Sequence, residues 1–204
     1  SMHFCAAPHL ALAPHTDQPY ISYWAFHKVS GPFVQYAWHD GSTWHPGTVE
    51  AGVSPSLAVD EAGRPHVSYS SGGLKYAWRD ETGWQIETVP VGDAGNGNPS
   101  LALDSQGYPH IGYAYGVSHT LHYARYDGTT WLTETICTAS EYVRHISLVL
   151  DKQDRPHVSY YDGEHGDLRY AWHDSTGWKT QILDSEGDVG HNNSLALSQH
   201  DAGW

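Results

Sequence analysis

The sequence predicts an all-β fold, a β-propeller of four-stranded antiparallel blades, and three observations support this. A unit of about 47 residues returns along the chain, because its leucine landmark recurs at positions 10, 57, 101, 148 and 195, in steps of 47, 44, 47 and 47 residues. Within each unit apolar and polar residues alternate with the period of a strand. Turn sequences rich in glycine and aspartate separate these short segments. Such units bury both of their faces only by stacking around an axis.

Each unit contains four predicted strands in one order. The first strand carries a Ser-Leu-Ala-Leu-like segment, and the second opens with a proline, which is tolerated where a strand begins. The third carries Tyr-Ala-Trp or a close variant, and the fourth begins with a tryptophan after a turn. These landmarks lie at 9–12, 56–59, 100–103, 147–150 and 194–197; at Pro19, Pro65, Pro109 and Pro156; at 36–38, 76–78, 123–125 and 170–172; and at Trp44, Trp84, Trp131 and Trp178.

The landmarks divide a single predicted domain, residues 1–204, into blades. Four complete blades are expected at about 9–52, 54–97, 98–144 and 145–191, followed by a partial blade at 192–204 that holds only a first strand. An unpaired apolar strand is an edge that proteins avoid exposing. We therefore expect it either to latch a four-bladed ring or, the alternative we favour, to pair with another chain in a homo-oligomer that completes a wider ring.

The composition excludes several classes of partner. Lysine and arginine number 10 against 23 acidic residues, which gives a formal net charge of −13. A chain without a basic patch is a poor ligand for nucleic acids or anionic membranes. No apolar run approaches the roughly 18 residues that a membrane helix needs. We therefore expect neither nucleic acid nor membrane as a partner.

Cysteine usage and the N-terminus bear on the compartment. Cys5 and Cys137 are too few for a disulfide framework, and we expect both to be free thiols. The N-terminus shows no basic start followed by an apolar core, the pattern of a signal peptide. Ser1 and Met2 are typical of the scar left when a tag is cleaved, so a leader would not be visible here. We expect an extracellular or cell-surface location.

A family resemblance rests on these motifs. The pattern Asp-x-x-Gly-x-Pro-His, followed by Tyr-Ala-Trp and Asp-Gly-x-x-Trp, resembles the repeats of bacterial sialidase-like and lectin-like propellers over nearly the whole chain. The turns at 40–44 and 127–131 resemble the Asp-box turn of sialidases, shortened by one residue. In that family the Asp-box is a structural turn, so the resemblance implies the fold. Its enzymes need an arginine cluster, whereas here only Arg144 and Arg169 fall near one rim, and sialidase activity is not expected.

Antiparallel geometry predicts where a ligand binds. The first and third turns of every blade share one edge of the sheet, and these turns are near-copies. The second turn and the connection between blades share the opposite edge and differ in each repeat, which is typical of a binding surface on a rigid scaffold. This variable rim carries aromatic faces for sugar C–H groups beside polar groups for sugar hydroxyls. The candidate glycan-binding residues are Trp24, His27, Tyr115, His119, Tyr142, Tyr161, Asp162 and His165. The alternative is that these are ordinary solvated loops whose aromatic residues cap the blade ends.

Two sets of residues are candidate metal ligands. His66, His110 and His157 share one blade position, and imidazoles from several blades can hold a metal. Tyr20 replaces the histidine in the first repeat, which favours buried imidazoles that bond the backbone of the next blade. The acidic segment 184–188 partly suits Ca²⁺ but lacks the remaining ligands of a calcium loop. We expect no cofactor.

The function that the sequence favours is a non-catalytic recognition module for a glycan on the variable rim. The first alternative is a polysaccharide hydrolase or lyase, since Asp162, Glu164 and Asp167 share that rim. The second is a protein-interaction scaffold. No catalytic residue is assigned.

Overall fold

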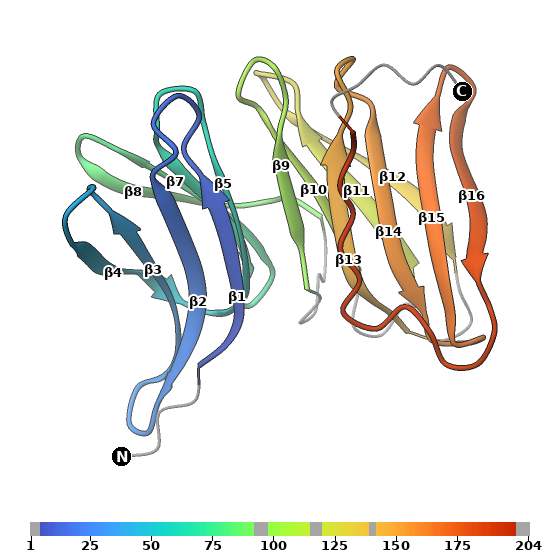
Figure 1. The fold of residues 1–204 in the computed structure, drawn as a ribbon, viewed down its shortest axis with the longest axis horizontal. Helices are drawn as coiled ribbons and strands as arrows, with labels where there is room; N and C mark the ends of the chain where they lie inside the picture. Colours follow the sequence, from blue (N-terminus) through green and yellow to red (C-terminus); the bar gives the residue numbers. More distant parts are fainter. Residues whose placement is uncertain (1–4, 92–97, 115–119, 139–141, 199–204) are drawn as a thin grey trace.

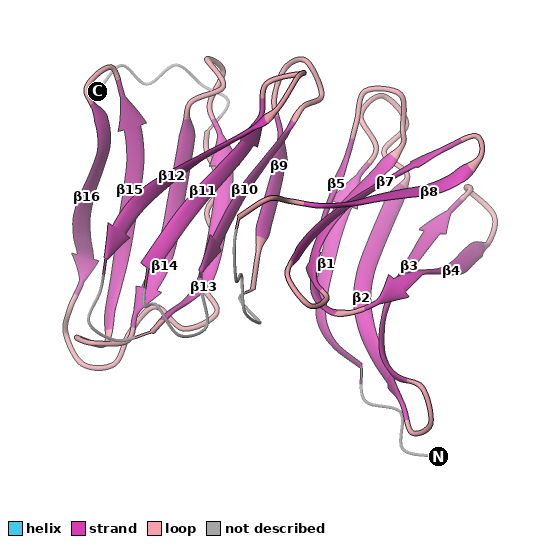
Figure 2. Ribbon diagram, turned by 180° about the vertical axis from the view of Figure 1, so that it is seen from behind, coloured by secondary structure: helices cyan, strands magenta, loops and turns pink. Residues whose placement is uncertain are grey.

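The computed structural model describes residues 5–91, 98–114, 120–138 and 142–198, and it is a four-bladed β-propeller (Figure 1). Each blade is an antiparallel sheet whose strand order follows the sequence, as predicted. The described residues contain no helix, and therefore none that could cross a bilayer (Figure 2). The strands are β1 Cys5–Leu12, β2 Pro19–His27, β3 Gly31–His39 and β4 Trp44–Ala51; β5 Val53–Val59, β6 Pro65–Ser70, β7 Leu74–Asp80 and β8 Gly83–Thr88; β9 Ser100–Leu103, β10 Pro109–Ala114, β11 Thr120–Tyr126 and β12 Trp131–Thr138; β13 Val143–Leu150, β14 Pro156–Asp162, β15 Asp167–Asp174 and β16 Gly177–Asp184.

The hydrophobic core lies between the blades. Buried apolar residues form three clusters, and each of them joins two consecutive blades. The second strands β6 and β10 are buried along their whole length, because a blade packs against each of their faces. In these strands the alternation of residue types therefore separates two faces that are both packed against neighbouring blades, and neither face is exposed to solvent.

A serine in the first strand joins each blade to the next. The backbone N–H of Leu101 donates to Ser56 Oγ at 3.0 Å, and that of Leu148 donates to Ser100 Oγ at 2.9 Å. His9 replaces serine in the first blade, and its Nδ1 accepts from Leu57 N–H at 3.3 Å. This contact explains why Ser-Leu recurs as a pair.

In the second, third and fourth blades, the tryptophan near the start of the fourth strand packs on a tyrosine of the preceding blade. Trp84 lies edge-on to Tyr36, Trp131 to Tyr76 and Trp178 to Tyr123, with ring centroids 5.1, 5.7 and 5.2 Å apart. These contacts repeat the same junction three times. They are the reason that tyrosine and tryptophan recur at fixed positions in the unit.

The recurring histidines bond within their own blades, so the expectation that they bond the backbone of the next blade is wrong. Nδ1 of His66 lies 2.5 Å from the Tyr76 hydroxyl, and Nε2 lies 3.4 Å from Asp60 Oδ2. His110 contacts Tyr123 and Asp104 in the same way, and His157 contacts Tyr170 and Asp151. In each of these blades the imidazole therefore lies between a tyrosine hydroxyl and an aspartate carboxylate of the same blade.

Residues 194–198 lie against the fourth blade but form no strand. The backbone N–H of Leu195 donates to Ser147 Oγ at 3.0 Å, which repeats the bond between blades. The segment thus takes the place where the first strand of a following blade would lie. The outer strands β4 and β16 stand at opposite ends of the molecule in both views (Figures 1 and 2).

Candidate functional site

The variable rim of the fourth blade gathers three separate segments into one site. Residues 142–145 include the start of β13, residues 161–169 cover the end of β14, the following turn and the start of β15, and residues 188–193 follow β16. Hydrogen bonds join them: Val189 N–H donates to Gly166 O at 2.8 Å, and Asn193 Nδ2 donates to His145 O at 2.7 Å. The site is therefore built on a fixed framework rather than on a single loop.

Aromatic rings form one half of this site. The ring of Tyr161 lies 4.1 Å from that of His191 and 6.1 Å from that of Tyr142, measured between centroids. Tyr161 is only 3% exposed, whereas Tyr142 is 38% exposed. The Arg144 guanidinium lies 4.3 Å from the Tyr142 ring centroid, a cation–π contact that orients the ring.

Hydrogen bonds hold the aromatic cluster in place. The Tyr161 hydroxyl donates to Asp188 Oδ1 at 2.8 Å, and this bond raises the Tyr161 pKa to about 12. His191 bridges Asp188 and His145, at 3.2 and 3.3 Å. Burial, with the nearby His191 and Arg144 as smaller causes, lowers the pKa of His145. Nε2 of His145 and Nδ1 of His191 thus form a direct imidazole–imidazole contact.

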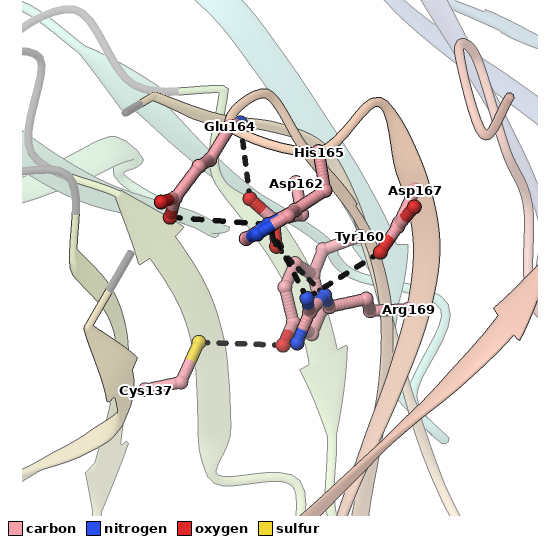
Figure 3. A network of polar contacts seen from close by, with 7 residues as sticks. All are labelled: Cys137, Tyr160, Asp162, Glu164, His165, Asp167 and Arg169. Carbon is pink, nitrogen blue, oxygen red and sulfur yellow. Dashed lines mark hydrogen bonds and ion pairs between the residues drawn. The ribbon is translucent and has the colours of Figure 1, made fainter. Parts of the chain in front are cut away.

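A compact polar network forms the other half of the site (Figure 3). Asp162 Oδ2 lies 2.7 Å from Arg169 Nε and 3.2 Å from His165 Nδ1. Arg169 also reaches Asp167 Oδ2, at 3.4 Å. Asp162 and Asp167 are 3% and 4% exposed, while His165 is exposed. One guanidinium therefore compensates two buried carboxylates, and His165 carries the network to the surface.

The same network bears on cation binding. Ligand atoms of Asp162, His165 and Asp167 lie within 4.8 Å of one another. Arg169 already supplies the positive charge between the two carboxylates. The arrangement suits a structural ion pair better than a metal, since a cation would have to displace the guanidinium.

Gly163 allows the two halves to meet. A Cβ at this position would lie 2.5 Å from the Tyr142 ring, and Gly163 N–H donates to Tyr142 O at 2.9 Å. Only a residue without a side chain permits this approach. The turn between β14 and β15 therefore holds Tyr142 against the fourth blade.

The predicted residues fall into three groups. Tyr142, Tyr161, Asp162 and His165 come together at the site just described. Trp24 and His27 lie on β2 in the first blade, where His27 packs edge-on against Phe33 at 5.6 Å. Tyr115 and His119 lie outside the described residues.

Sequence reasoning places Arg144, Asp167 and Arg169 near this rim, and Asp188 in the acidic segment 184–188, but it predicts none of them as a member of the ligand-binding site. It does not single out His145 or His191 at all. Asp188 and His191 belong to the connection after β16, whose sequence differs from those of the other connections. The repeat contains no signal for their partners, because the bonds join segments that are unique to the fourth blade.

Cys137 is a free thiol of β12 that faces the fourth blade from the third. Its Sγ donates to the Tyr160 hydroxyl at 3.3 Å, and burial raises its pKa. A thiol in this state is a poor nucleophile.

Comparisons with known proteins support the fold. No known family matches the sequence, and no curated protein matches it. Among solved structures, a fucose-binding lectin of Aleuria aurantia in complex with alpha-methyl-L-fucoside is similar at a TM-score of 0.65 and 14% identity, over 87% of this chain and 61% of that one. The sialidase NanB is similar at a TM-score of 0.68 and 10% identity, over 89% and 52%.

A GH43 glycoside hydrolase with engineered endo-xylanase and exo-arabinofuranosidase activity is similar at a TM-score of 0.55 and 10% identity, over 87% of this chain and 39% of that one. This chain thus spans between two fifths and three fifths of the length of these three proteins. The expected likeness to sialidase-like and lectin-like propellers is confirmed at the level of the fold.

Proposed function

We propose that this chain is a non-catalytic recognition module that binds a glycan at the variable rim of the fourth blade. One observation carries the proposal: an exposed, oriented tyrosine ring, Tyr142, stands at a rim where two imidazoles are each held by a carboxylate, His165 by the buried Asp162 and His191 by the exposed Asp188. Both parts are prearranged, which reduces the entropy lost on binding.

The chemistry of the site matches that of a sugar. The C–H face of a pyranose is apolar and stacks on an aromatic ring such as Tyr142. Its hydroxyl groups both donate and accept hydrogen bonds, and an imidazole ring offers two nitrogen atoms that can pair with them. His165 and His191 are exposed on either half of the site, and their contacts with Asp162 and Asp188 fix their orientation. The structural likeness to a lectin crystallised with a fucoside adds support.

The geometry favours recognition over glycoside hydrolysis. A retaining hydrolase needs two carboxyl groups about 5–5.5 Å apart that both face the substrate. Asp162 and Asp167 have a comparable separation, with ligand atoms within 4.8 Å. Both are buried and both bind Arg169, so neither faces a ligand.

A glycan array that includes methyl α-L-fucoside tests the proposal. We expect the chain to bind a restricted set of glycans, and Tyr142→Ala to abolish that binding. Phe26→Ala is the matched control, because Phe26 is 40% exposed on the rim of the first blade and Tyr142 is 38% exposed. Absence of binding to any glycan, or equal binding by Tyr142→Ala, would refute the proposal. Release of reducing sugar from a bound glycan would favour the enzyme alternative.

A further inference from the structure

The outer face of the fourth blade carries residues that, at the three internal junctions, receive the following blade. In those junctions, Tyr36, Tyr76 and Tyr123 receive the tryptophan of the following blade, and they are 7%, 5% and 2% exposed. Tyr170 holds the same position in the fourth blade but is only partly buried. Leu183 is 50% exposed, although its counterparts Val89 and Ile136 are 1% and 7% exposed.

The polar groups of the junction are also present on this face. Glu87 and Glu134 accept the indole N–H of the following tryptophan, at 3.0 and 2.9 Å. Each lies opposite the junction tyrosine, in the register Tyr76↔Glu87 and Tyr123↔Glu134. Gln181 lies opposite Tyr170 in the same register. Its amide oxygen is an acceptor for an indole N–H.

A cleft of about 730 Å³ lies over this face. Tyr170, Trp172 and Leu183 line it together with Leu195 and Leu197 of the segment after β16. The lining is therefore largely apolar, as expected for a surface shaped to receive a further blade.

The complementary face is uncovered at the other end of the molecule. Trp44 holds the position of Trp84, Trp131 and Trp178, but it is 45% exposed. Tyr23 is partly buried, whereas its counterparts Tyr69, Tyr113 and Tyr160 are 0%, 2% and 1% exposed. In the first junction the Tyr69 hydroxyl donates to Glu50 at 2.6 Å. Asp184 holds the position of Glu50 in the fourth blade, opposite Leu168 as Glu50 is opposite Val34.

We propose that the fourth blade binds the first blade of a second copy of this chain, with Trp44 against Tyr170 and Gln181, and Tyr23 beside Asp184. The contact joins two different surfaces, so it is head-to-tail. In a ring of two copies, the fourth blade of each copy contacts the first blade of the other. Such a ring contains eight blades, the upper end of the usual range for propellers.

The segment 194–197 occupies part of the docking surface. Leu195 lies where Leu10 of the incoming blade would pack, and Leu10 is 61% exposed at present. β1 is paired with β2 along its length, whereas 194–197 forms no strand. The incoming β1 therefore displaces this segment.

Light scattering at micromolar concentration tests the docking. We expect the wild-type chain to have at least twice its monomer mass of 22.6 kDa. Trp44→Ala and Leu183→Glu each weaken association by roughly tenfold or more, because each removes one side of the junction. Both positions are exposed, so neither variant should disturb folding, which thermal melting checks. Phe26→Ala is the control and should associate as the wild type does.

Mixing the two variants is the sharper experiment. The Trp44→Ala chain keeps an intact fourth-blade face, and the Leu183→Glu chain keeps Trp44 on its first blade. The mixture should therefore form a complex that contains one chain of each variant, although neither variant associates by itself. Truncation after Asn193 should leave association intact or tighten it. A monomeric wild type, an oligomer insensitive to both substitutions, a mixture that stays monomeric, or loss of association on truncation would overturn the proposal.

Discussion

The indole nitrogen of Trp178 donates a hydrogen bond of 2.9 Å to Glu134, which belongs to the preceding blade. Trp131 and Glu87 repeat this contact one blade earlier. In the first junction Gly47 stands at the position of the glutamate, and the Trp84 indole N–H has no hydrogen-bond partner. A Cβ at Gly47 would lie 2.5 Å from the Tyr36 ring, so the close approach of this tyrosine excludes an acceptor there.

Glu134→Leu should destabilise the chain by about 1 kcal/mol, because it removes the acceptor of a partly buried indole N–H. Glu134→Gln keeps an acceptor oxygen and should cost less than half as much. Urea unfolding followed by tryptophan fluorescence measures both. Equal losses would show that the hydrogen bond contributes little and that packing alone holds the junction.

Tryptophans at the same repeat position should differ in their contribution to stability. Trp131→Ala removes a ring from the core between the second and third blades and should cost about 3–5 kcal/mol. Trp44→Ala, measured in monomer at low concentration, should cost less than about 0.5 kcal/mol, since the ring is exposed. Comparable losses would contradict the assignment of Trp44 to a free face.

Stability should fall in mild acid. Burial lowers the pKa of His66 and of His110 from the ordinary value of 6.5, and Asp60 and Asp104 oppose this shift only partly. The unfolded chain therefore binds more protons than the folded chain once the pH falls below 6.5, and the free energy of unfolding decreases as pH falls through that value. The pKa values of Asp60 and Asp151 are lowered from 3.8, so the stability they contribute is lost only at lower pH.

The measurement is the urea midpoint between pH 8 and pH 5. It should hold steady above about pH 7 and then decline. The double variant His66→Asn, His110→Asn should be less stable at pH 8 but show a shallower decline. An unchanged slope would assign the pH dependence to other groups, such as His9, His122 and His145, whose pKa values burial also lowers.

Gly163→Ala tests the site without touching its polar groups. The new Cβ would overlap the Tyr142 ring and displace it, so glycan affinity should fall by roughly tenfold or more. Gly41→Ala, in a turn of the opposite edge with open space around it, is the control for a glycine-to-alanine change away from the site, and its φ of +98° adds backbone strain that Gly163→Ala does not. Retained affinity in Gly163→Ala would argue against Tyr142 as the stacking surface.

Much of the fold follows from the repeat, and much of the site does not. The spacing of Leu57, Leu101 and Leu148 predicts the blades because every junction reuses one set of contacts. The candidate site depends on contacts that occur once, such as that of His191 with Tyr161. Tyr161 also shows the limit of a pattern: the sequence places it in a variable turn, yet it lies near the end of β14 and is only 3% exposed.

The claim that the rim of the fourth blade is a glycan site is tested most directly by calorimetric titration. The ligand is the strongest binder from the array, and the proteins are the wild type, Tyr142→Ala and Phe26→Ala. The account predicts that Tyr142→Ala loses roughly 1.4 kcal/mol or more of binding free energy, a tenfold change, while Phe26→Ala binds as the wild type does. Unchanged binding by Tyr142→Ala, or an equal loss in Phe26→Ala, would contradict it.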